Sequence, residues 1–113
     1  MSGAEMLSAL EHGVSQYPEP AGLYIHVAGI YVVFDPNNEP GERVMQVTMS
    51  DGSPFDLSAT FTVATIDFIT AGGDGYDLGG GRLVYFGSDS EILADFLRSE
   101  AVIRPDAEGR VRR

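Results

Sequence analysis

A β-type run that ends in a glycine-rich loop is the feature that most constrains this chain. Residues 60–66 (Thr-Phe-Thr-Val-Ala-Thr-Ile) are β-branched or aromatic at nearly every position, which predicts a strand. Asp67 and Phe68 follow, and residues 72–75 read Gly-Gly-Asp-Gly. Glycine permits positive φ angles and a close approach of other groups to the backbone. The pattern therefore predicts a tight, exposed loop that carries an aromatic ring and a carboxylate, as binding loops on rigid scaffolds commonly do.

Two helices are predicted to flank this region, because the same start signal occurs twice. Residues 2–5 and residues 88–91 both read Ser-x-x-Glu, the spacing of a capping box. Apolar residues at helical spacing follow each motif, so we expect helices over about residues 3–12 and 89–99. Runs rich in β-branched and aromatic residues predict strands. The strand candidates are residues 23–34, 43–49, 54–57, 60–66 and 82–86.

This order of elements predicts an α+β fold. We expect a mostly antiparallel mixed sheet of about four to six strands, packed with the two helices. A chain of 113 residues, 43% of them hydrophobic, is long enough for one modest core. Residues 1–113 are therefore expected to form a single domain.

Charge and composition exclude several classes of function. The net charge is −10, with 17 acidic residues against seven basic ones, all of them arginine. This field repels nucleic acid polymers and anionic membranes, so neither is an expected partner. No apolar run approaches the roughly 18 residues of a membrane span, and no membrane insertion is predicted. The absence of cysteine excludes a disulfide framework, a thiolate metal site and a thiol nucleophile.

Few residues offer chemistry. His12 and His26 lie in a predicted helix and strand, away from carboxylate-rich loops, so a helix-terminal and a strand-surface histidine are simpler interpretations than metal ligands. No nucleophile-elbow motif occurs, and the glycine loop lacks the Lys-Ser/Thr of a phosphate-binding loop. Phe68 and Asp74 are ligand-binding candidates. From composition and spacing alone the structural interpretation is the more common one: Phe68 as the last core residue of a strand and Asp74 as a solvated loop acid. Tyr24 is equally well interpreted as a half-buried strand aromatic.

Five short motifs share their order and spacing with one known family. They are Ser-Gly-Ala-Glu-Met-Leu at residues 2–7, Leu-Glu-His-Gly-Val at 10–14, Tyr-Ile-His-Val-Ala-Gly-Ile at 24–30, Asp-Phe at 67–68 with Gly-Gly-Asp-Gly-Tyr at 72–76, and Pro-Asp-Ala-Glu-Gly-Arg-Val at 105–111. Together they resemble the C-terminal domain of 5′-nucleotidases, a family that includes UDP-sugar hydrolases and cyclic-nucleotide phosphodiesterases. The resemblance covers nearly the whole chain.

The resemblance implies a substrate-binding role. In that family the C-terminal domain binds the nucleoside, whereas a separate N-terminal metallophosphatase domain holds two divalent metal ions and cleaves the phosphate ester. By resemblance, Tyr24 and Phe68 sandwich a base, Asp74 accepts hydrogen bonds from ribose, and Gly72 and Gly73 complete the loop. The implied partners are a nucleoside or nucleotide and the metallophosphatase domain. No catalytic residue, metal site or cofactor is implied within this chain.

The chain also departs from the family pattern. Tyr24 stands where Phe is common, His26 where Gln is common and Asp67 where Asn is common. The metal motifs of the catalytic domain are absent, as are the Asn-Gly-Gly-type loop and the arginines that contact base and phosphate in the family. We therefore expect an N-terminally truncated part of a substrate-binding domain that is not catalytic alone. The resemblance implies a periplasmic, secreted or cell-surface location.

Two alternatives come from other classes of protein. The chain could be a freestanding α+β interaction or structural module that retains the fold and forms a homodimer through an open sheet edge. It could also be an independent enzyme, although it has no metal set and no nucleophile constellation.

Overall fold

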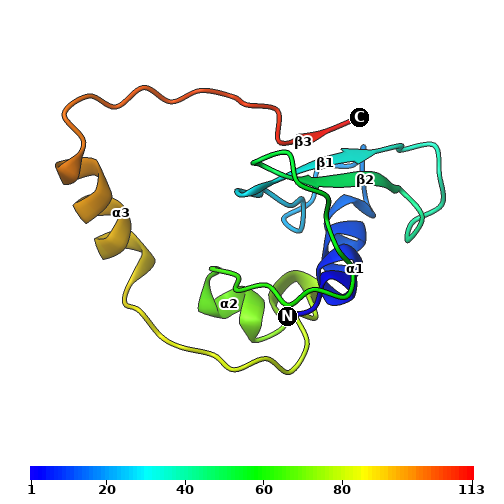
Figure 1. Ribbon diagram of the computed structural model, residues 1–113, viewed down its shortest axis with the longest axis horizontal. Helices are drawn as coiled ribbons and strands as arrows, with labels where there is room; N and C mark the ends of the chain where they lie inside the picture. Colours follow the sequence, from blue (N-terminus) through cyan, green and yellow to red (C-terminus); the bar gives the residue numbers. More distant parts are fainter.

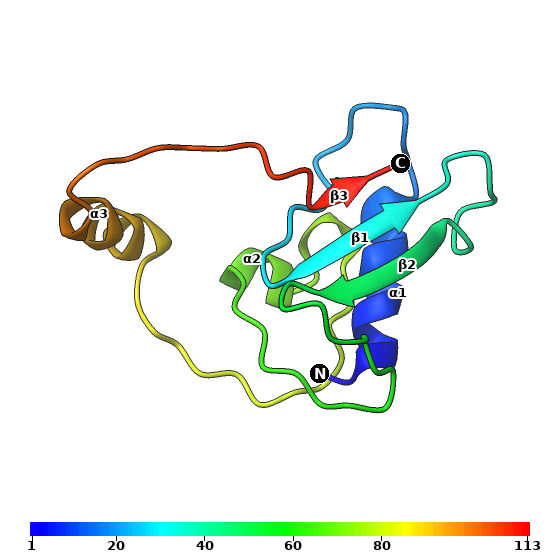
Figure 2. The same cartoon turned by 45° about the horizontal axis from the view of Figure 1, so that its top comes forward.

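The computed structural model describes all 113 residues and places a three-stranded sheet beside one long helix (Figures 1 and 2). The sheet order is β2-β1-β3, with β1 antiparallel to β2 and parallel to β3. The elements in chain order are helix α1 (Gly3–Val14), strands β1 (Ile30–Phe34) and β2 (Val44–Met49), helix α2 (Asp67–Thr70), the 3₁₀ turn η1 (Gly73–Gly75), helix α3 (Asp89–Ser99) and strand β3 (Val111–Arg112).

Helix α1 begins as its sequence predicts. The Ser2 hydroxyl accepts a hydrogen bond from the Glu5 N–H (3.2 Å), and the Glu5 carboxylate accepts one from the Ser2 N–H (2.6 Å), so the capping box is complete. The helix runs to Val14, two residues beyond the predicted end. Its buried side chains, Ala9, Leu10 and Val14, form the stripe that faces the rest of the molecule.

The core is divided into two clusters that α1 joins. Leu10 packs with Ile30 and Val32 on the inner face of β1, while its neighbour Ala9 packs with Leu23 and Tyr76. Strand β1 alternates buried and half-buried residues along its length, which is the pattern of a strand covered on one face. The helix therefore connects the sheet to the segment that contains the glycine loop.

The sheet has three strands, so the expectation of about four to six is wrong. Only Ile30–Phe34 of the 23–34 candidate forms a strand, and residues 54–57 and 60–66 contribute single bridges, Thr48 to Pro54 and Ser2 to Thr60. Residues 82–86 are not a strand either. The physical reason is a lack of partners: beyond Phe61, whose N–H and C=O both bond Met1, residues 62–65 make no backbone hydrogen bond.

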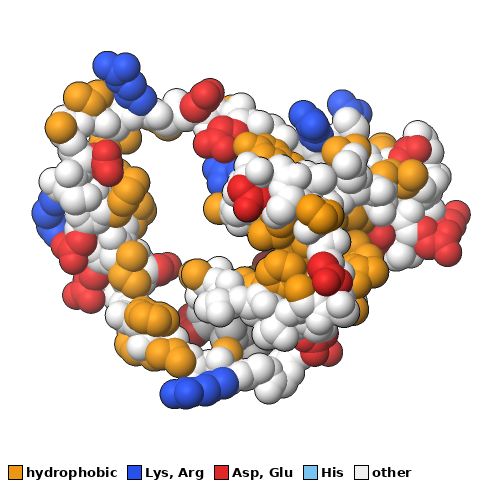
Figure 3. Space-filling model, viewed as in Figure 1, with side chains coloured by type: hydrophobic (Ala, Val, Ile, Leu, Met, Phe, Trp, Pro, Cys, Tyr) orange, Lys and Arg blue, Asp and Glu red, His pale blue; other side chains and the backbone are white.

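After Gly79 the chain leaves the body of the molecule, residues 1–79, and forms an arc over residues 80–110 before it reaches β3. Helix α3 coincides with the predicted 89–99 helix, but none of its residues is buried. Extended segments on either side of α3 carry the chain away from the body and back to β3 (Figure 1). Figure 3 shows an opening between α3 and the body, with hydrophobic side chains on the inner side of the arc.

Candidate functional site

The first two residues of the Leu-Glu-His-Gly motif fix helix α1 to the core and to strand β2. Leu10 is 1% exposed and belongs to the core. The Glu11 carboxylate accepts hydrogen bonds from the N–H groups of Arg43 (2.9 Å) and Val44 (2.8 Å), which fixes the start of β2 to the helix. Because a carboxylate makes strong hydrogen bonds to backbone N–H groups, this contact holds α1 rigidly against the sheet.

Arg43 binds the C-terminal end of helix α1. Its side chain is buried, and Nη1 donates to the carbonyl oxygens of Val14 (2.8 Å), Ser15 (2.8 Å) and Tyr17 (2.9 Å). These carbonyls lie at and beyond the C-terminus of α1, where the helix leaves them without internal partners and where a cation is favourable. Arg43 is thus a structural residue and is not free to bind a ligand.

His12 contacts the glycine loop directly. Its Nε2 lies 2.8 Å from the carbonyl oxygen of Asp74. Since a carbonyl only accepts, the Nε2–H of His12 is the donor. The His12 ring also meets Tyr76 edge-on, with centroids 4.8 Å apart, and lies against Gly75, where an added Cβ would come within 3.2 Å of the ring. The interpretation of His12 as a simple helix-terminal residue missed this contact.

Tyr76 fixes the far end of the loop. It is buried, and its hydroxyl donates to the carbonyl oxygen of Leu23 at 2.6 Å. Burial, followed by the charge of nearby Asp74, raises the pKa of Tyr76 to about 12. Gly13 makes this approach possible, because a Cβ at residue 13 would lie 2.7 Å from the Tyr76 hydroxyl and 2.6 Å from Ile25.

Phe68 lies on the short helix α2. The prediction that residues 60–66 form a strand that ends at Phe68 is therefore wrong. Its side chain is 53% exposed. Gly73 lies beneath the ring: a Cβ at residue 73 would be 2.4 Å from Cε1 of Phe68. Gly72 reverses the chain with a φ of +88°. The requirement for glycine at residues 72 and 73 is therefore conformational at the first and steric at the second.

Asp74 has a backbone conformation that no other non-glycine residue of the chain adopts, with φ +53° and ψ +21°. Its carboxylate is exposed and accepts no hydrogen bond from the protein. The nearest neighbour noted for it is Gly22, where an added Cβ would be 3.4 Å from Oδ2 of Asp74. The glycine at residue 22 therefore leaves open space beside the acid.

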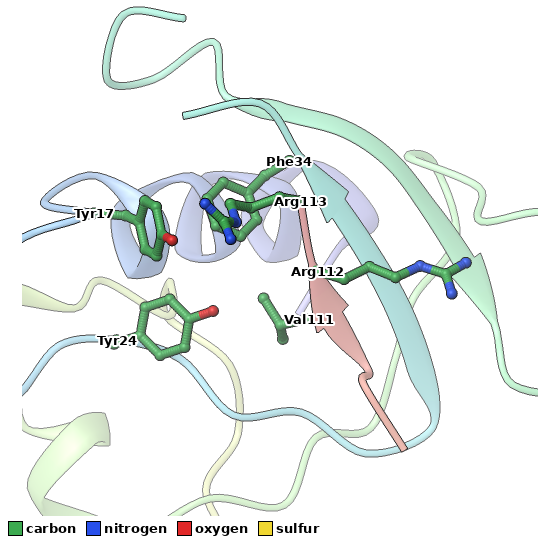
Figure 4. Close-up of a pocket in the computed structure, with 6 residues that line it drawn as sticks. All are labelled: Tyr17, Tyr24, Phe34, Val111, Arg112 and Arg113. Atoms are coloured by element: carbon green, nitrogen blue, oxygen red, sulfur yellow. The ribbon is translucent and has the colours of Figure 1, made fainter. Parts of the chain in front are cut away.

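Tyr24 follows Gly22 by two residues and lines two hollows. The first, about 600 Å³, is bounded by six residues that Figure 4 labels, and its aromatic members are Tyr17, Tyr24 and Phe34. The Arg113 guanidinium lies 5.6 Å from the Tyr17 ring centroid, whereas the Arg112 side chain points away. Burial is the main cause that raises the pKa of Tyr24.

The second hollow, about 620 Å³, is largely apolar. Residues 22–30, residues 61–66 and helix α1 line it, and Ile69 of α2 contributes to its wall. Tyr24 contributes to this hollow too. Its ring meets His26 edge-on at 5.8 Å, so His26 is a packing partner of Tyr24.

The five residues singled out in the sequence therefore lie along one continuous path. Phe68 covers Gly73, Gly72 and Asp74 flank Gly73, and the Asp74 carboxylate lies beside Gly22, which leads to Tyr24. Sequence reasoning missed Tyr17 and Arg113 at the first hollow and His12 under the loop. These depend on contacts between distant parts of the chain, and no local pattern signals them.

No group of three or more His, Asp or Glu side chains lies in an arrangement that could hold a metal ion. The residues present therefore do not fit the two-ion centre that the family resemblance implies for its catalytic domain. None of the helices has the length and apolar character needed to cross a membrane.

Comparison with known proteins places the chain. It matches the family model described as 5′-nucleotidase, C-terminal domain over residues 1–79. It is similar to human 5′-nucleotidase, with 27% identity over 99% of this chain and 21% of that protein. It is also similar to the trifunctional nucleotide phosphoesterase protein YfkN of Bacillus subtilis, with 34% identity over 99% of this chain and 8% of that protein.

A solved structure agrees with the sequence comparisons. The 5′-nucleotidase precursor from Thermus thermophilus superposes with a TM-score of 0.91 at 37% identity, over 99% of this chain and 24% of that one. The chain thus spans between 8% and 24% of these three proteins. On the match over residues 1–79, the chain belongs to the 5′-nucleotidase C-terminal domain family.

Proposed function

We propose that this chain is the nucleoside-binding part of a 5′-nucleotidase-like phosphoester hydrolase and is not catalytic alone. In this proposal the substrate is a nucleotide. A separate N-terminal metallophosphatase domain of a longer protein supplies the two divalent metal ions and the attack of water on the phosphate ester. The names of the relatives, a 5′-nucleotidase and a nucleotide phosphoesterase, support this substrate class.

The conformation of Asp74 is the observation that carries the proposal. A non-glycine residue in the left-handed region costs on the order of 1–2 kcal/mol, and Asp is among the residues that tolerate this region best. The surrounding residues hold Asp74 there, yet its carboxylate makes no bond within the protein. Backbone strain of this kind is concentrated at functional sites. An ionised carboxylate accepts strong hydrogen bonds from neutral donors, so a pair of vicinal ribose hydroxyls suits it.

Phe68 and Tyr24 are the two aromatic side chains that would hold the base in this proposal. Phe68 exposes 53% of its surface although it is large and apolar, and Tyr24 lines two hollows. Stacking of a base on an aromatic side chain contributes about 1–3 kcal/mol. A base bound between these residues would remove the Phe68 face from water while Asp74 accepts from the ribose.

The first experiment is a titration of the chain with adenosine and AMP, followed through the amide shifts of Tyr24, Phe68 and Asp74. We expect saturable shifts at all three, lost in Phe68→Ala. Phe96→Ala is the matched control, because Phe96 is 56% exposed but lies on α3. Unchanged spectra at millimolar ligand, from a folded sample, would contradict the proposal.

A second titration tests the role of Asp74. Adenosine is compared with 2′-deoxyadenosine, which lacks one of the two vicinal hydroxyls. The wild-type chain should bind adenosine about tenfold more tightly, the equivalent of one hydrogen bond to a charged group. Asp74→Ala, which has no acceptor, should bind the two nucleosides equally. Discrimination that survives in Asp74→Ala would remove Asp74 from the ribose site.

The observation that favours the alternative, a freestanding interaction module, is the exposed apolar surface of the arc. Leu83 (71% exposed), Phe86 (87%) and Phe96 (56%) offer apolar surface with no partner within the chain. Homodimerisation stays a prediction of this alternative. A sedimentation-equilibrium mass that rises from monomer to dimer at micromolar concentration would support it, and a constant monomer mass would contradict it.

A further inference from the structure

We propose that His12 is a positioning residue that sets the orientation of the Asp74 carboxylate. This inference rests on the proposed function, in which Asp74 accepts from ribose. His12 itself lies beneath the loop and is not required to touch the ligand. Its role is to hold, through one backbone hydrogen bond, the conformation that aims Asp74 outward.

The loop needs an external constraint. Gly72 (φ +88°), Asp74 (φ +53°) and Gly75 (φ +79°) all have left-handed conformations within four residues. The glycines adopt these angles without strain, but an aspartate favours the right-handed or extended regions. Turning the backbone at Asp74 back to negative φ would rotate its Cβ and carry the carboxylate away from the space beside Gly22.

His12 provides that constraint through a single atom pair. Its Nε2–H donates to the Asp74 carbonyl oxygen at 2.8 Å, across 62 residues of sequence. The direction of this carbonyl depends on φ and ψ of Asp74 together, because the peptide that joins Asp74 to Gly75 is planar, so the hydrogen bond restrains both angles. The ring packs on Gly75 and on the edge of Tyr76, which restricts movement of the imidazole itself.

The histidine is in turn fixed to the core. Leu10 and Gly13 of the same helical turn are buried, and the Glu11 carboxylate is bonded to the backbone of β2. Four consecutive residues of α1 therefore make four different contacts. Leu10 packs on β1 and Glu11 bonds the start of β2, while His12 contacts the glycine loop and Gly13 lies against Tyr76. The arrangement transmits the rigidity of the core to an acid that is otherwise exposed.

Two variants separate the hydrogen bond from the ring. His12→Gln keeps a side-chain N–H donor of similar reach but removes the ring. His12→Phe keeps the ring edge against Tyr76 but has no donor. Both are compared with the wild-type chain through the ¹³Cα and amide shifts of Asp74 and Gly75, which report the backbone conformation of the loop without any ligand.

The expected result is a division between the two variants. In His12→Phe the Asp74 shifts should move toward right-handed or extended values, and the dissociation constant for adenosine should rise about tenfold, the equivalent of one lost hydrogen bond. His12→Gln should keep the Asp74 shifts and bind within about threefold of wild type. Asp74 shifts that are unchanged in His12→Phe, or equally displaced in both variants, would overturn the positioning role.

A third measurement needs no variant. Long-range ¹H–¹⁵N correlation of the wild-type imidazole should report a proton on Nε2 of His12, since only that form donates to the carbonyl. A neutral ring protonated on Nδ1 would overturn the inference. If the wild-type chain binds no adenosine, the proposed function fails, whereas the loop shifts and the tautomer still decide the role of His12.

Discussion

The body of the molecule and its arc are built from similar residues but differ completely in burial. All 11 buried residues lie between Gly3 and Tyr76, and none lies in the arc of residues 80–110. The arc nevertheless contains a helix of regular length with an apolar stripe, Ile92, Leu93, Phe96 and Leu97, each more than 40% exposed. The family match also ends at residue 79. Local sequence thus specifies the helix, whereas burial requires a surface to pack against.

The same substitution at one leucine in each region should give the largest difference. Leu10→Ala removes a side chain that is 1% exposed, and we expect a loss of about 3 kcal/mol in the free energy of unfolding. Leu93→Ala affects a side chain that is 56% exposed, with an expected change within about 0.5 kcal/mol. Urea denaturation followed by circular dichroism measures both. Equal losses would mean that the arc is packed in solution.

Two glycines provide the next comparison. Alanine at residue 73 would place Cβ 2.4 Å from the Phe68 ring and 2.5 Å from its carbonyl oxygen. We expect a loss of about 2 kcal/mol, as at overpacked sites, together with displacement of Phe68. An added Cβ at Gly80, in the arc, meets nothing within 4 Å, so Gly80→Ala should change stability by less than about 0.5 kcal/mol. Denaturation of both variants, with Phe68 ring shifts, tests the pair; a neutral Gly73→Ala would contradict the close packing.

Two tyrosines extend the comparison to pH. Tyr76 is 7% exposed and donates to Leu23, whereas Tyr85 is 81% exposed. Tyr76→Phe leaves the Leu23 carbonyl unpaired, and we expect a loss of about 1.5 kcal/mol near neutral pH. Tyr85→Phe should have no measurable effect.

The raised pKa of Tyr76 gives this pair a second readout. Its folded-state pKa of about 12 lies above the ordinary value of 10.0, because burial disfavours the phenolate. The stability that Tyr76 contributes is therefore full below pH 10 and is lost as the pH rises through 12. Wild type and Tyr85→Phe should weaken over that range more steeply than Tyr76→Phe. Parallel profiles would contradict a buried, neutral Tyr76.

Local signals predicted α1, α3 and the second strand, but not α2 or the pairing of the other strands. Helix α3 lies where its pattern predicts, and β2 differs from its prediction by one residue. Residues 60–66 have as strong a β pattern as β1, yet only the first two of them pair with another extended segment. Strand β3 was missed because two residues between arginines give no pattern, and only pairing with Val32 and Val33 makes them a strand.

In the candidate site, too, the sequence predicted the local features but not those that depend on distant contacts. The sequence predicted an exposed loop with Asp74, and the loop is exposed. It could not predict that Phe68 would lie on a helix, because the course of residues 60–66 depends on hydrogen-bond partners. Nor could it predict the left-handed Asp74 or the contact of its carbonyl oxygen with His12, 62 residues away in the sequence. The roles of Tyr24, Phe68 and Asp74 in binding stay predictions.

The two Ser-x-x-Glu motifs give the smallest expected effect and the most closely matched test. Around Ser2 both hydrogen bonds of the capping box form, whereas the Ser88 hydroxyl contacts the Ser90 hydroxyl (2.8 Å) and caps nothing. Ser2→Ala should therefore cost about 1 kcal/mol and Ser88→Ala only a few tenths.

Titration of Glu5 distinguishes loss of the cap from a general weakening of the body. Hydrogen bonds from the Ser2 N–H and then from its hydroxyl hold the Glu5 pKa below its ordinary value. The stability from Glu5 is thus present above the pKa of the unfolded carboxyl and is lost as the pH falls through the lowered one. In Ser2→Ala the Glu5 pKa, measured from the carboxyl ¹³C shift, should move partway up, because only the hydroxyl bond disappears. An unmoved Glu5 pKa with an undiminished free energy of unfolding would show that the box adds nothing to α1. Ser2 and Ser88 would then contribute equally little to the stability of their helices, although only Ser2 forms the capping hydrogen bonds.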